Sequence, residues 1–270
     1  MRILGREMKM KRRVRARVAK LIAFMFPLLL LPLVLHRLGG SAEGCAGCWS
    51  GYGPGDERFN KPLADLRILY EKEGKACLPA IENALISDRD HLVKQRAATY
   101  IGEIKDPSSI PTLESMIAEL YKKVSFGFFG VGTPDFQTRL KVAHVLATMG
   151  PGNNADRIWQ RYDRLDGLKK SEVPYLLNAL NDPKLSERLL EILSRGKDPY
   201  AIISALEILA TNGGVQVLSS LKSRVTEWEG KEPESSDPAN PDAPIIYYSV
   251  LRIKAEQTIF RIEERSRRAS

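Results

Sequence analysis

The sequence has few of the side chains that usually carry chemistry. Its 270 residues include three cysteines and three histidines. The histidines, His36, His91 and His144, are scattered and lack the spacing of zinc ligands. No nucleophile with a matching base and acid, no glycine-rich phosphate loop and no HExxH motif occurs. The sequence therefore offers no catalytic residue, no cofactor site and no metal site, which favours a binding protein over an enzyme.

Strand patterns are also missing. Strict alternation of apolar and polar residues is essentially absent, whereas helical periodicity starts near Lys61 and continues along the chain. A chain of 270 residues can bury a sizeable core without metal or disulfide crosslinks. We therefore expect an all-α protein.

An excess of charge of one sign is confined to one end of the chain. The net charge is +8, and residues 1–20 alone carry nine Lys or Arg against the single Glu7. From Glu43 onward the chain holds 31 basic and 32 acidic residues. Because this remainder is electrically balanced, it gives no electrostatic footprint for nucleic acid, and we expect no nucleic-acid partner.

The longest apolar run is short for a membrane span. "LIAFMFPLLLLPLVL", residues 21–35, follows the basic block, whereas about 20 apolar residues are needed to cross a bilayer. The basic start, the short apolar run and the small residues that follow are typical of a secretory signal peptide. An uncleaved anchor with its basic end in the cytoplasm is the alternative. Residues 1–44 are thus predicted to direct the protein to the cell envelope. We expect the protein to be exported and to be either membrane-associated or periplasmic.

Two cysteines follow this segment on a glycine-rich tether, residues 45–60. Cys45 and Cys48 form a CxxC with no second CxxC to complete a zinc site. The sequence "AEGC" resembles a bacterial lipobox, which implies that Cys45 is acylated and tethers the chain to a membrane. Cys48 and Cys77 would then remain as a pair that an oxidising compartment could join, although Cys77 equally fits a small buried position on a helix.

The stretch "AATYIGEIKDPSSIPTLESMI", residues 97–117, predicts two helices separated by a break at Asp106-Pro107. The small residue Gly102 on the first helix has a counterpart 45 residues on, in Ala147. Small residues at one helical position let two antiparallel helices approach closely. One pair cannot bury both of its faces, so we expect stacked antiparallel pairs, an α-solenoid over residues 61–228.

One unit of this pattern resembles a known family. "LVKQRAATYIGEIKDPSSIPTLESMI", residues 92–117, resembles a HEAT repeat, of the kind also found in phycobilisome lyases. The matching residues are Arg96, Ala97, Ala98, Ile101, Gly102, Asp106, Ile110, Pro111 and Leu113. The resemblance covers roughly residues 61–228 and implies an extended surface that binds partner proteins. It also implies an alternative, a lyase-like enzyme or enzyme accessory that attaches a ligand to a protein.

A glycine-rich insertion separates two of the expected helix pairs. It places Phe126, Phe128 and Phe129 among glycines, where exposed aromatic rings could contact a partner or a membrane. The alternative is that these rings fold back over the groove of the solenoid.

The C-terminal part predicts a loop and a last helix. Residues 229–244 are acidic, rich in proline and poor in apolar residues, so we expect a disordered loop. Residues 245–270 predict a capping helix with Val250, Ile253 and Phe260 on one face.

Trp159 and Tyr162 lie near each other in the third expected helix pair. They could contact a partner in the concave groove, although a packed core is the alternative. Taken together, the sequence predicts an exported, membrane-tethered HEAT-type scaffold or adaptor in a bacterial envelope. Its expected partners are another protein, and a membrane reached through the N-terminal segment or a lipid.

Overall fold

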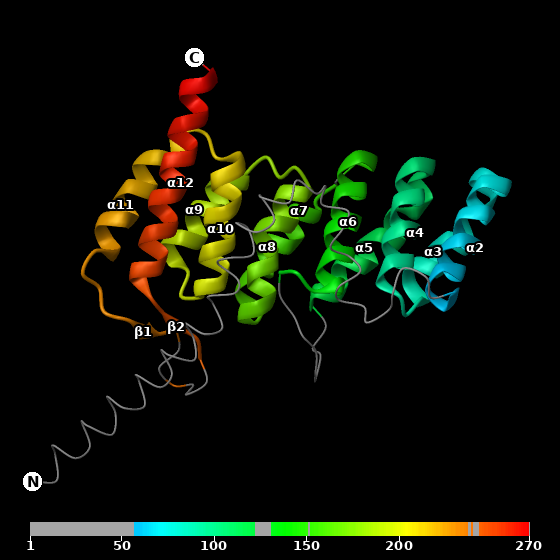
Figure 1. Cartoon of the computed structure of the whole chain (residues 1–270), viewed down its shortest axis with the longest axis horizontal. Helices are drawn as coiled ribbons and strands as arrows, with labels where there is room; N and C mark the ends of the chain where they lie inside the picture. The colour runs from blue at the N-terminus through cyan, green and yellow to red at the C-terminus, as the bar shows by residue number, and fades with distance from the viewer. Residues whose placement is uncertain (1–56, 122–130, 151, 237–238, 240–242, 270) are drawn as a thin grey trace, which may run out of the picture. The chain divides into compact units, whose positions relative to one another are not determined.

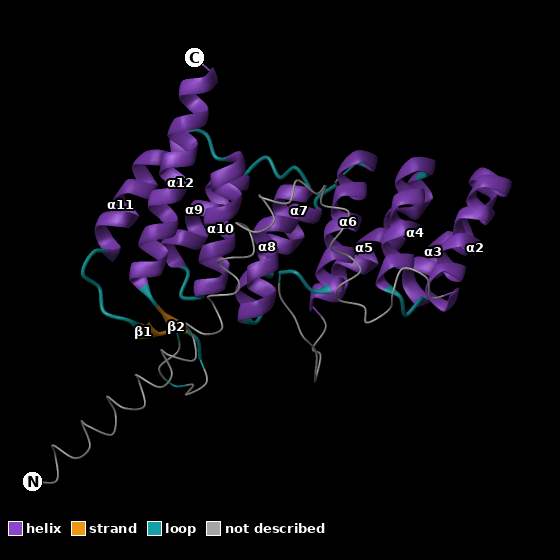
Figure 2. Cartoon of the chain, in the orientation of Figure 1, coloured by secondary structure: helices purple, strands orange, loops and turns teal. Residues whose placement is uncertain are grey.

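The computed structural model describes residues 57–121, 131–150, 152–236, 239 and 243–269. The chain separates into two compact units, Met1–Asn60 and Lys61–Ser270, and nearly all of the described residues belong to the second. These residues are mainly helical, which confirms the prediction of an all-α protein (Figure 2). Among them no helix is both long enough and apolar enough to span a bilayer.

The α-helices follow one another along the chain, and the longest connections are those before α6 and before α12 (Figure 1). They are α2 (Glu57–Glu73), α3 (Leu78–Ser87), α4 (His91–Ile104), α5 (Ile110–Ala118), α6 (Pro134–Met149), α7 (Asn154–Gln160), α8 (Gly167–Ala179), α9 (Leu185–Arg195), α10 (Pro199–Asn212), α11 (Leu218–Trp228) and α12 (Tyr248–Ala269). Short 3-10 helices are η2 (Gly74–Cys77), η3 (Pro107–Ser109), η4 (Glu119–Tyr121), η5 (Tyr162–Arg164) and η6 (Val215–Val217). Helix α2 begins at Glu57, inside the predicted flexible tether, because the helix-breaking glycines and prolines of that tether end at Gly55.

The predicted break between α4 and α5 is confirmed. The carboxylate of Asp106 accepts a hydrogen bond from the backbone N–H of Ser108 at 3.0 Å, and Pro107 opens the short helix η3. Proline suits the first turn of a helix because its missing N–H would have no partner there. The chain therefore leaves α4 at Lys105, turns at Asp106-Pro107 and enters α5.

The helices pack in a regular order. Helices α4, α6, α8, α10 and α12 form one row, in which each packs on the next. Each of these also packs on the helix that precedes it in the chain, which gives the pairs α3–α4, α5–α6, α7–α8, α9–α10 and α11–α12. The helices from α3 to α12 thus meet helices close to them in the sequence. One apolar core runs through the array from Leu66 to Ile262.

Gly102 has a different neighbour from the one expected. The sequence predicts small residues where the two helices of one hairpin meet, α4 and α5. Instead, a side-chain carbon built on Gly102 would lie 3.0 Å from Cγ2 of Val145 on α6. The absence of a side chain at Gly102 therefore allows α4 to lie close to α6, the next helix of its row.

The last helix docks with a face that the sequence did not predict. Val250, Ile253 and Phe260 are exposed, at 38%, 50% and 62%, so the expected docking face is wrong. The buried face of α12 consists of Leu251, Ala255, Thr258 and Ile262, and it packs on α10 and α11. Helix α12 therefore carries apolar residues on two sides, and only one of these sides is buried.

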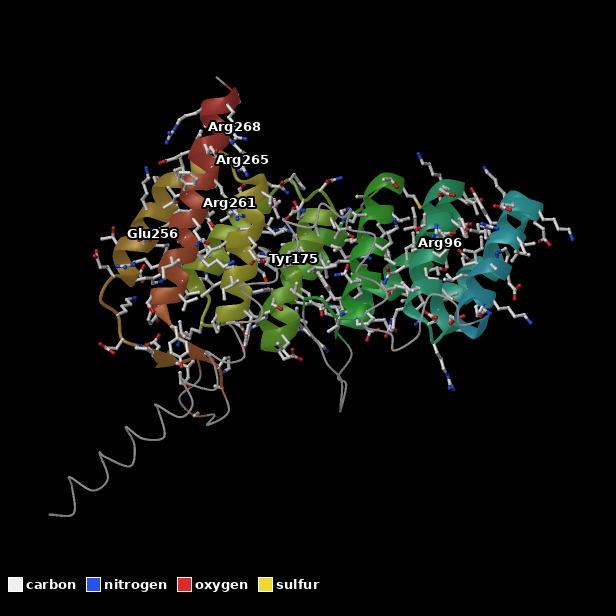
Figure 3. The ribbon with its side chains drawn as sticks, viewed as in Figure 1. Arg96, Tyr175, Glu256, Arg261, Arg265 and Arg268 are labelled. Carbon is white, nitrogen blue, oxygen red and sulfur yellow. The ribbon has the colours of Figure 1, made fainter. Side chains whose placement is uncertain are left out.

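Polar side chains cross the row of even-numbered helices. Arg139 on α6 makes a buried, bidentate ion pair with Glu172 on α8, with N···O distances of 2.7 to 3.0 Å. Tyr175, labelled in Figure 3, donates a hydrogen bond from α8 to Glu207 on α10 at 2.5 Å. Lys254 on α12 donates to the same carboxylate at 3.0 Å. These contacts fix how each helix lies along its neighbour.

Part of the loop predicted as disordered, residues 229–244, has regular structure. Strand β1 (Glu234–Ser235) pairs antiparallel with β2 (Ile245–Ile246), with Glu234 opposite Ile246. Ile246 is buried and belongs to the core, so its burial holds this short pairing against the helices. Two-residue strands give too little alternation to be detected in the sequence.

Candidate functional site

Several of the candidate residues from the sequence lie outside the described residues. These are Cys45, Cys48, Phe126, Phe128 and Phe129. Cys77 is described: it ends η2, is 2% exposed, and its thiol donates a hydrogen bond to the carbonyl oxygen of Gly74 at 2.8 Å. Burial raises the pKa of this thiol, which disfavours the reactive thiolate. Acylation of Cys45 and a disulfide between Cys48 and Cys77 stay predictions.

The structure brings Trp159 and Tyr162 together. Trp159 is half-buried near the end of α7, and Tyr162 opens η5 and is 9% exposed. Their rings stack with centroids 5.2 Å apart and an interplanar angle of 21°. The guanidinium of Arg188 lies over the Trp159 ring, and the ammonium of Lys170 lies 5.6 Å from the centroid of the Tyr162 ring. Tyr162 is thus part of the core, while Trp159 reaches its edge.

Both residues line a concave pocket of about 690 Å³. Its wall is built by α7, η5, the first turns of α8 and α10, the end of α9 and the chain beside β1 and β2. The volume lies within the range of about 300 to 1,000 Å³ that is usual for ligand pockets. The two aromatic residues that the sequence singled out therefore line a pocket, and a partner contact there stays a prediction.

Two aspartates at this pocket begin helices. Asp166 caps α8 by accepting from the backbone N–H of Lys169 at 3.0 Å. Asp198 caps α10, and its Oδ1 accepts from the N–H groups of Tyr200 and Ala201 at 2.9 and 3.0 Å. Aspartate is favoured at such positions because its oxygen satisfies N–H groups that the helix leaves unpaired. The starts of α8 and α10 therefore present carboxylates to the same pocket.

Gly167 allows the two helix starts to lie close together. A side-chain carbon built on this glycine would lie 2.3 Å from Oδ2 of Asp198, a distance at which the carboxylate would have to move. Only the absence of a side chain lets Asp198 lie against the first residue of α8. The position of the Asp198 carboxylate is therefore set by the packing of α8 on α10.

Burial shifts the pKa values of two side chains at the pocket, Asp198 and Tyr162. Burial raises the pKa of Asp198, and the nearby charge of Asp166 adds to this, although two backbone N–H groups and Lys170 act in the opposite direction. Burial also raises the pKa of Tyr162, and the carboxylates of Asp198 and Asp163 contribute. The phenol therefore stays neutral, and the charged form of Asp198 is poorly solvated.

One polar atom in this region has no partner. The hydroxyl of Tyr162 is buried and makes no hydrogen bond with any described residue. Within the described ranges, no three His, Cys, Asp or Glu side chains are grouped as metal ligands. The arrangement suits recognition of a polar group through hydrogen bonds and charge.

The sequence did not point to Asp198 or Gly167. The "KDP" of residues 197–199 repeats the "KDP" of residues 105–107, so it could have located a second helix start. It could not have shown that this start lies against Gly167, 31 positions earlier in the sequence, because that contact depends on tertiary packing.

Comparisons with protein-family models, with curated proteins and with solved structures found no match to this chain.

Proposed function

We propose that this protein is an exported, membrane-tethered α-solenoid of the HEAT type that acts as a scaffold or adaptor. It binds another protein through its helical surface, and its N-terminal segment or a lipid on Cys45 holds it at a membrane of the cell envelope. The proposal combines the resemblance of residues 92–117 to a HEAT repeat with the basic and apolar start of the chain.

The observation that carries the proposal is the order of helix packing. Each helix pair packs on the neighbouring pairs, and the even-numbered helices form a continuous row. Arrays built in this way generally offer an extended surface to partner proteins rather than one deep catalytic cleft. The pocket beside Trp159 adds a hollow on this array in which a group of a partner could lie.

The test is chemical cross-linking of the full-length chain in its native membranes, followed by identification of the attached proteins. A chain consisting of residues 1–60 alone is the control, because it shares the membrane segment and lacks the helical body. We expect at least one protein to be enriched reproducibly over this control. Enrichment equal to that of residues 1–60 would contradict a scaffold function and would favour a purely structural envelope protein.

The membrane part of the proposal has its own test. The intact mass and the N-terminus of the native protein should show a chain that begins at an acylated Cys45 or that retains Met1. An unmodified start near Glu43 would contradict tethering and would indicate a soluble exported protein.

A second candidate function is the lyase-like enzyme or enzyme accessory. The observation that favours it is the pocket itself, since a lyase needs a cleft with convergent polar groups, and Asp166, Asp198 and Tyr162 line this one. A chromophore that copurifies with the native protein and absorbs visible light would support this function. A protein without such absorbance that still cross-links to a partner would contradict it.

A further inference from the structure

Helix α12 carries an uncharged stripe on its outer side. Val250, Ile253, Gln257 and Phe260 follow one another at intervals of three, four and three residues, so they lie along one side of the helix. All four are exposed. The buried face of α12, which includes Leu251, lies on the opposite side and packs on α10 and α11. The described part of the chain therefore leaves this stripe uncovered.

The stripe lies where the row of helices ends. Helices α4, α6, α8, α10 and α12 each pack on the next, and α12 is the last described member of this row. The terminal units of such arrays need a polar outer face to remain soluble. An apolar stripe on the side of α12 away from α10 therefore favours one more helix in the row, supplied by another molecule.

Charges of opposite sign flank the stripe on its two sides. One flank carries Glu256 and Glu263, and the other carries Lys254, Arg261 and Arg268 (Figure 3 labels Glu256, Arg261 and Arg268). When two parallel helices meet along such a stripe, a residue on one flank lies near the residue five positions later on the other flank of the second helix. Glu256 then meets Arg261 of the second copy, and Glu263 meets Arg268. The charge pattern is therefore complementary to itself in the parallel orientation.

Other orientations of a second copy bring unfavourable charges together. In an antiparallel contact each flank meets the same flank of the second copy, so acidic residues face acidic ones and basic residues face basic ones, which is destabilising. In a head-to-tail contact the stripe would lie on α2, whose exposed side carries Arg67 and Glu71 beside Ile68. Covering these charges with apolar groups costs free energy. The parallel contact between two α12 helices is the favourable one.

The flanking charges can exchange their present partners. Glu256 is paired with Arg252 at 3.6 Å, and Arg268 with Glu264 at 2.5 Å. Glu263 receives a hydrogen bond from Lys222 at 2.8 Å. These pairs lie at the surface, where an ion pair contributes little, so replacing it by one to a second copy costs little.

We propose that a second copy of this chain docks on α12, with the two α12 helices parallel and the stripe of one copy against the stripe of the other. Such a contact uses the same surface on both copies and closes into a dimer. Gln257 then faces Gln257 of the second copy, and one polar residue in such a seam fixes the register of the helices at a cost in stability.

The dimer agrees with the proposed membrane tether, although the contact itself does not depend on it. Residues 250–260 make about three helical turns, so the apolar contact is small and weak in solution. A tether to one membrane raises the local concentration of the copies and favours weak contacts. Rotation about an axis parallel to α12 also keeps the N-terminal segments of both copies on the same side.

The test uses the full-length chain in its native membranes, expressed as two copies with different tags. The photo-crosslinking amino acid p-benzoylphenylalanine replaces Phe260 in one copy. Illumination should join the two differently tagged copies, and mass spectrometry should locate the attachment within one turn of position 260 in the second copy. The same amino acid in place of Ile68, an exposed apolar residue of α2, is the matched control and should give no such dimer.

Charge reversal tests the orientation of the two helices. Glu256→Arg or Arg261→Glu replaces two symmetric attractions by repulsions, so each should lower the cross-linked fraction about threefold or more. The double variant Glu256→Arg/Arg261→Glu places opposite charges together again and should recover the yield of the wild type. Glu71→Arg makes the same change of charge at an exposed position of α2 and should leave the yield unchanged.

Several results would overturn the proposal. Attachment of the probe at position 260 to lipid alone would assign the stripe to a membrane surface, and attachment to a different protein would assign it to that partner. Attachment near Val250 of the second copy would show an antiparallel contact, and attachment to α2 a head-to-tail one. A double variant that cross-links as poorly as the single variants, or a probe that attaches to nothing, would also refute the parallel dimer. The scaffold function is tested separately, because its cross-linking experiment reports other proteins bound anywhere on the helical body.

Discussion

Breaking the buried ion pair between Arg139 and Glu172 should destabilise the helical array strongly. The arginine side chain is 6% exposed and the glutamate side chain 0%, and the two are joined by bidentate hydrogen bonds. Glu172→Gln leaves a buried guanidinium without its counter-charge. The loss of one partner of such a pair costs about 3 to 5 kcal/mol.

This cost should appear as a large shift in thermal and urea unfolding. For a chain of this size each kcal/mol lowers the midpoint by about 2 to 4 °C, so Glu172→Gln should lower it by roughly 6 to 20 °C. The double variant Arg139→Met/Glu172→Leu removes both charges and fills the space with apolar groups. It should be close to wild type or more stable, because the desolvation of the two ions is then avoided.

Circular dichroism at 222 nm, followed through urea and heat, measures these differences. The matched control is Glu71→Gln, which breaks the exposed pair between Arg67 and Glu71, whose side chains are 66% and 63% exposed. Exposed pairs of this kind contribute about 0.3 to 0.5 kcal/mol. A Glu172→Gln variant as stable as Glu71→Gln would refute the reasoning, and so would a double variant as unstable as the single one.

Further predictions concern helix contacts, a cap and pH. Arg265→Met removes two hydrogen bonds to carbonyl oxygens at the end of α10, one of them 2.6 Å long, and should cost about 1 to 3 kcal/mol, seen as faster amide hydrogen exchange along α12. Gly102→Val should destabilise by more than about 1 kcal/mol in urea unfolding, and substitution of Val145 by alanine in the same chain should recover part of this, because the two positions meet. Thr133→Ala removes the cap of α6 and should cost about 1 kcal/mol by the same measurement. Burial raises the pKa of Asp198, so the folded chain binds that proton more tightly than the unfolded chain, and wild-type stability falls as the pH rises above the ordinary aspartate pKa of about 3.9. Asp198→Asn should therefore match the wild type in urea unfolding at pH 3 and exceed it at pH 7; an equal difference at both pH values would contradict this sign.

Local patterns allowed much of the fold to be predicted. The break at Asp106-Pro107 depends on residues within one turn, where proline geometry acts directly. Such features can be predicted because the residues that determine them are neighbours in the sequence.

Features that join distant parts of the chain could not be predicted in this way. Gly102 is small because of Val145, which lies on another helix. The docking face of α12 could not be chosen from its periodicity, because Leu251 and Ile253 both belong to plausible apolar stripes. Which of the two is buried depends on packing against α10 and α11, which are other parts of the chain. The pocket likewise requires the packing of α8 on α10, so Trp159 was found as an aromatic residue but Asp198 was not recognised.

The order in which the helices pack also bears on how the protein folds. Because each helix meets helices a short distance away along the chain, most contacts form without closing long loops. Chains dominated by such local contacts fold quickly, and their neighbouring units can form in more than one order. We therefore expect more than one folding pathway. In one of them α8, α9 and α10 assemble and form the pocket before α2 and α3 pack on the array.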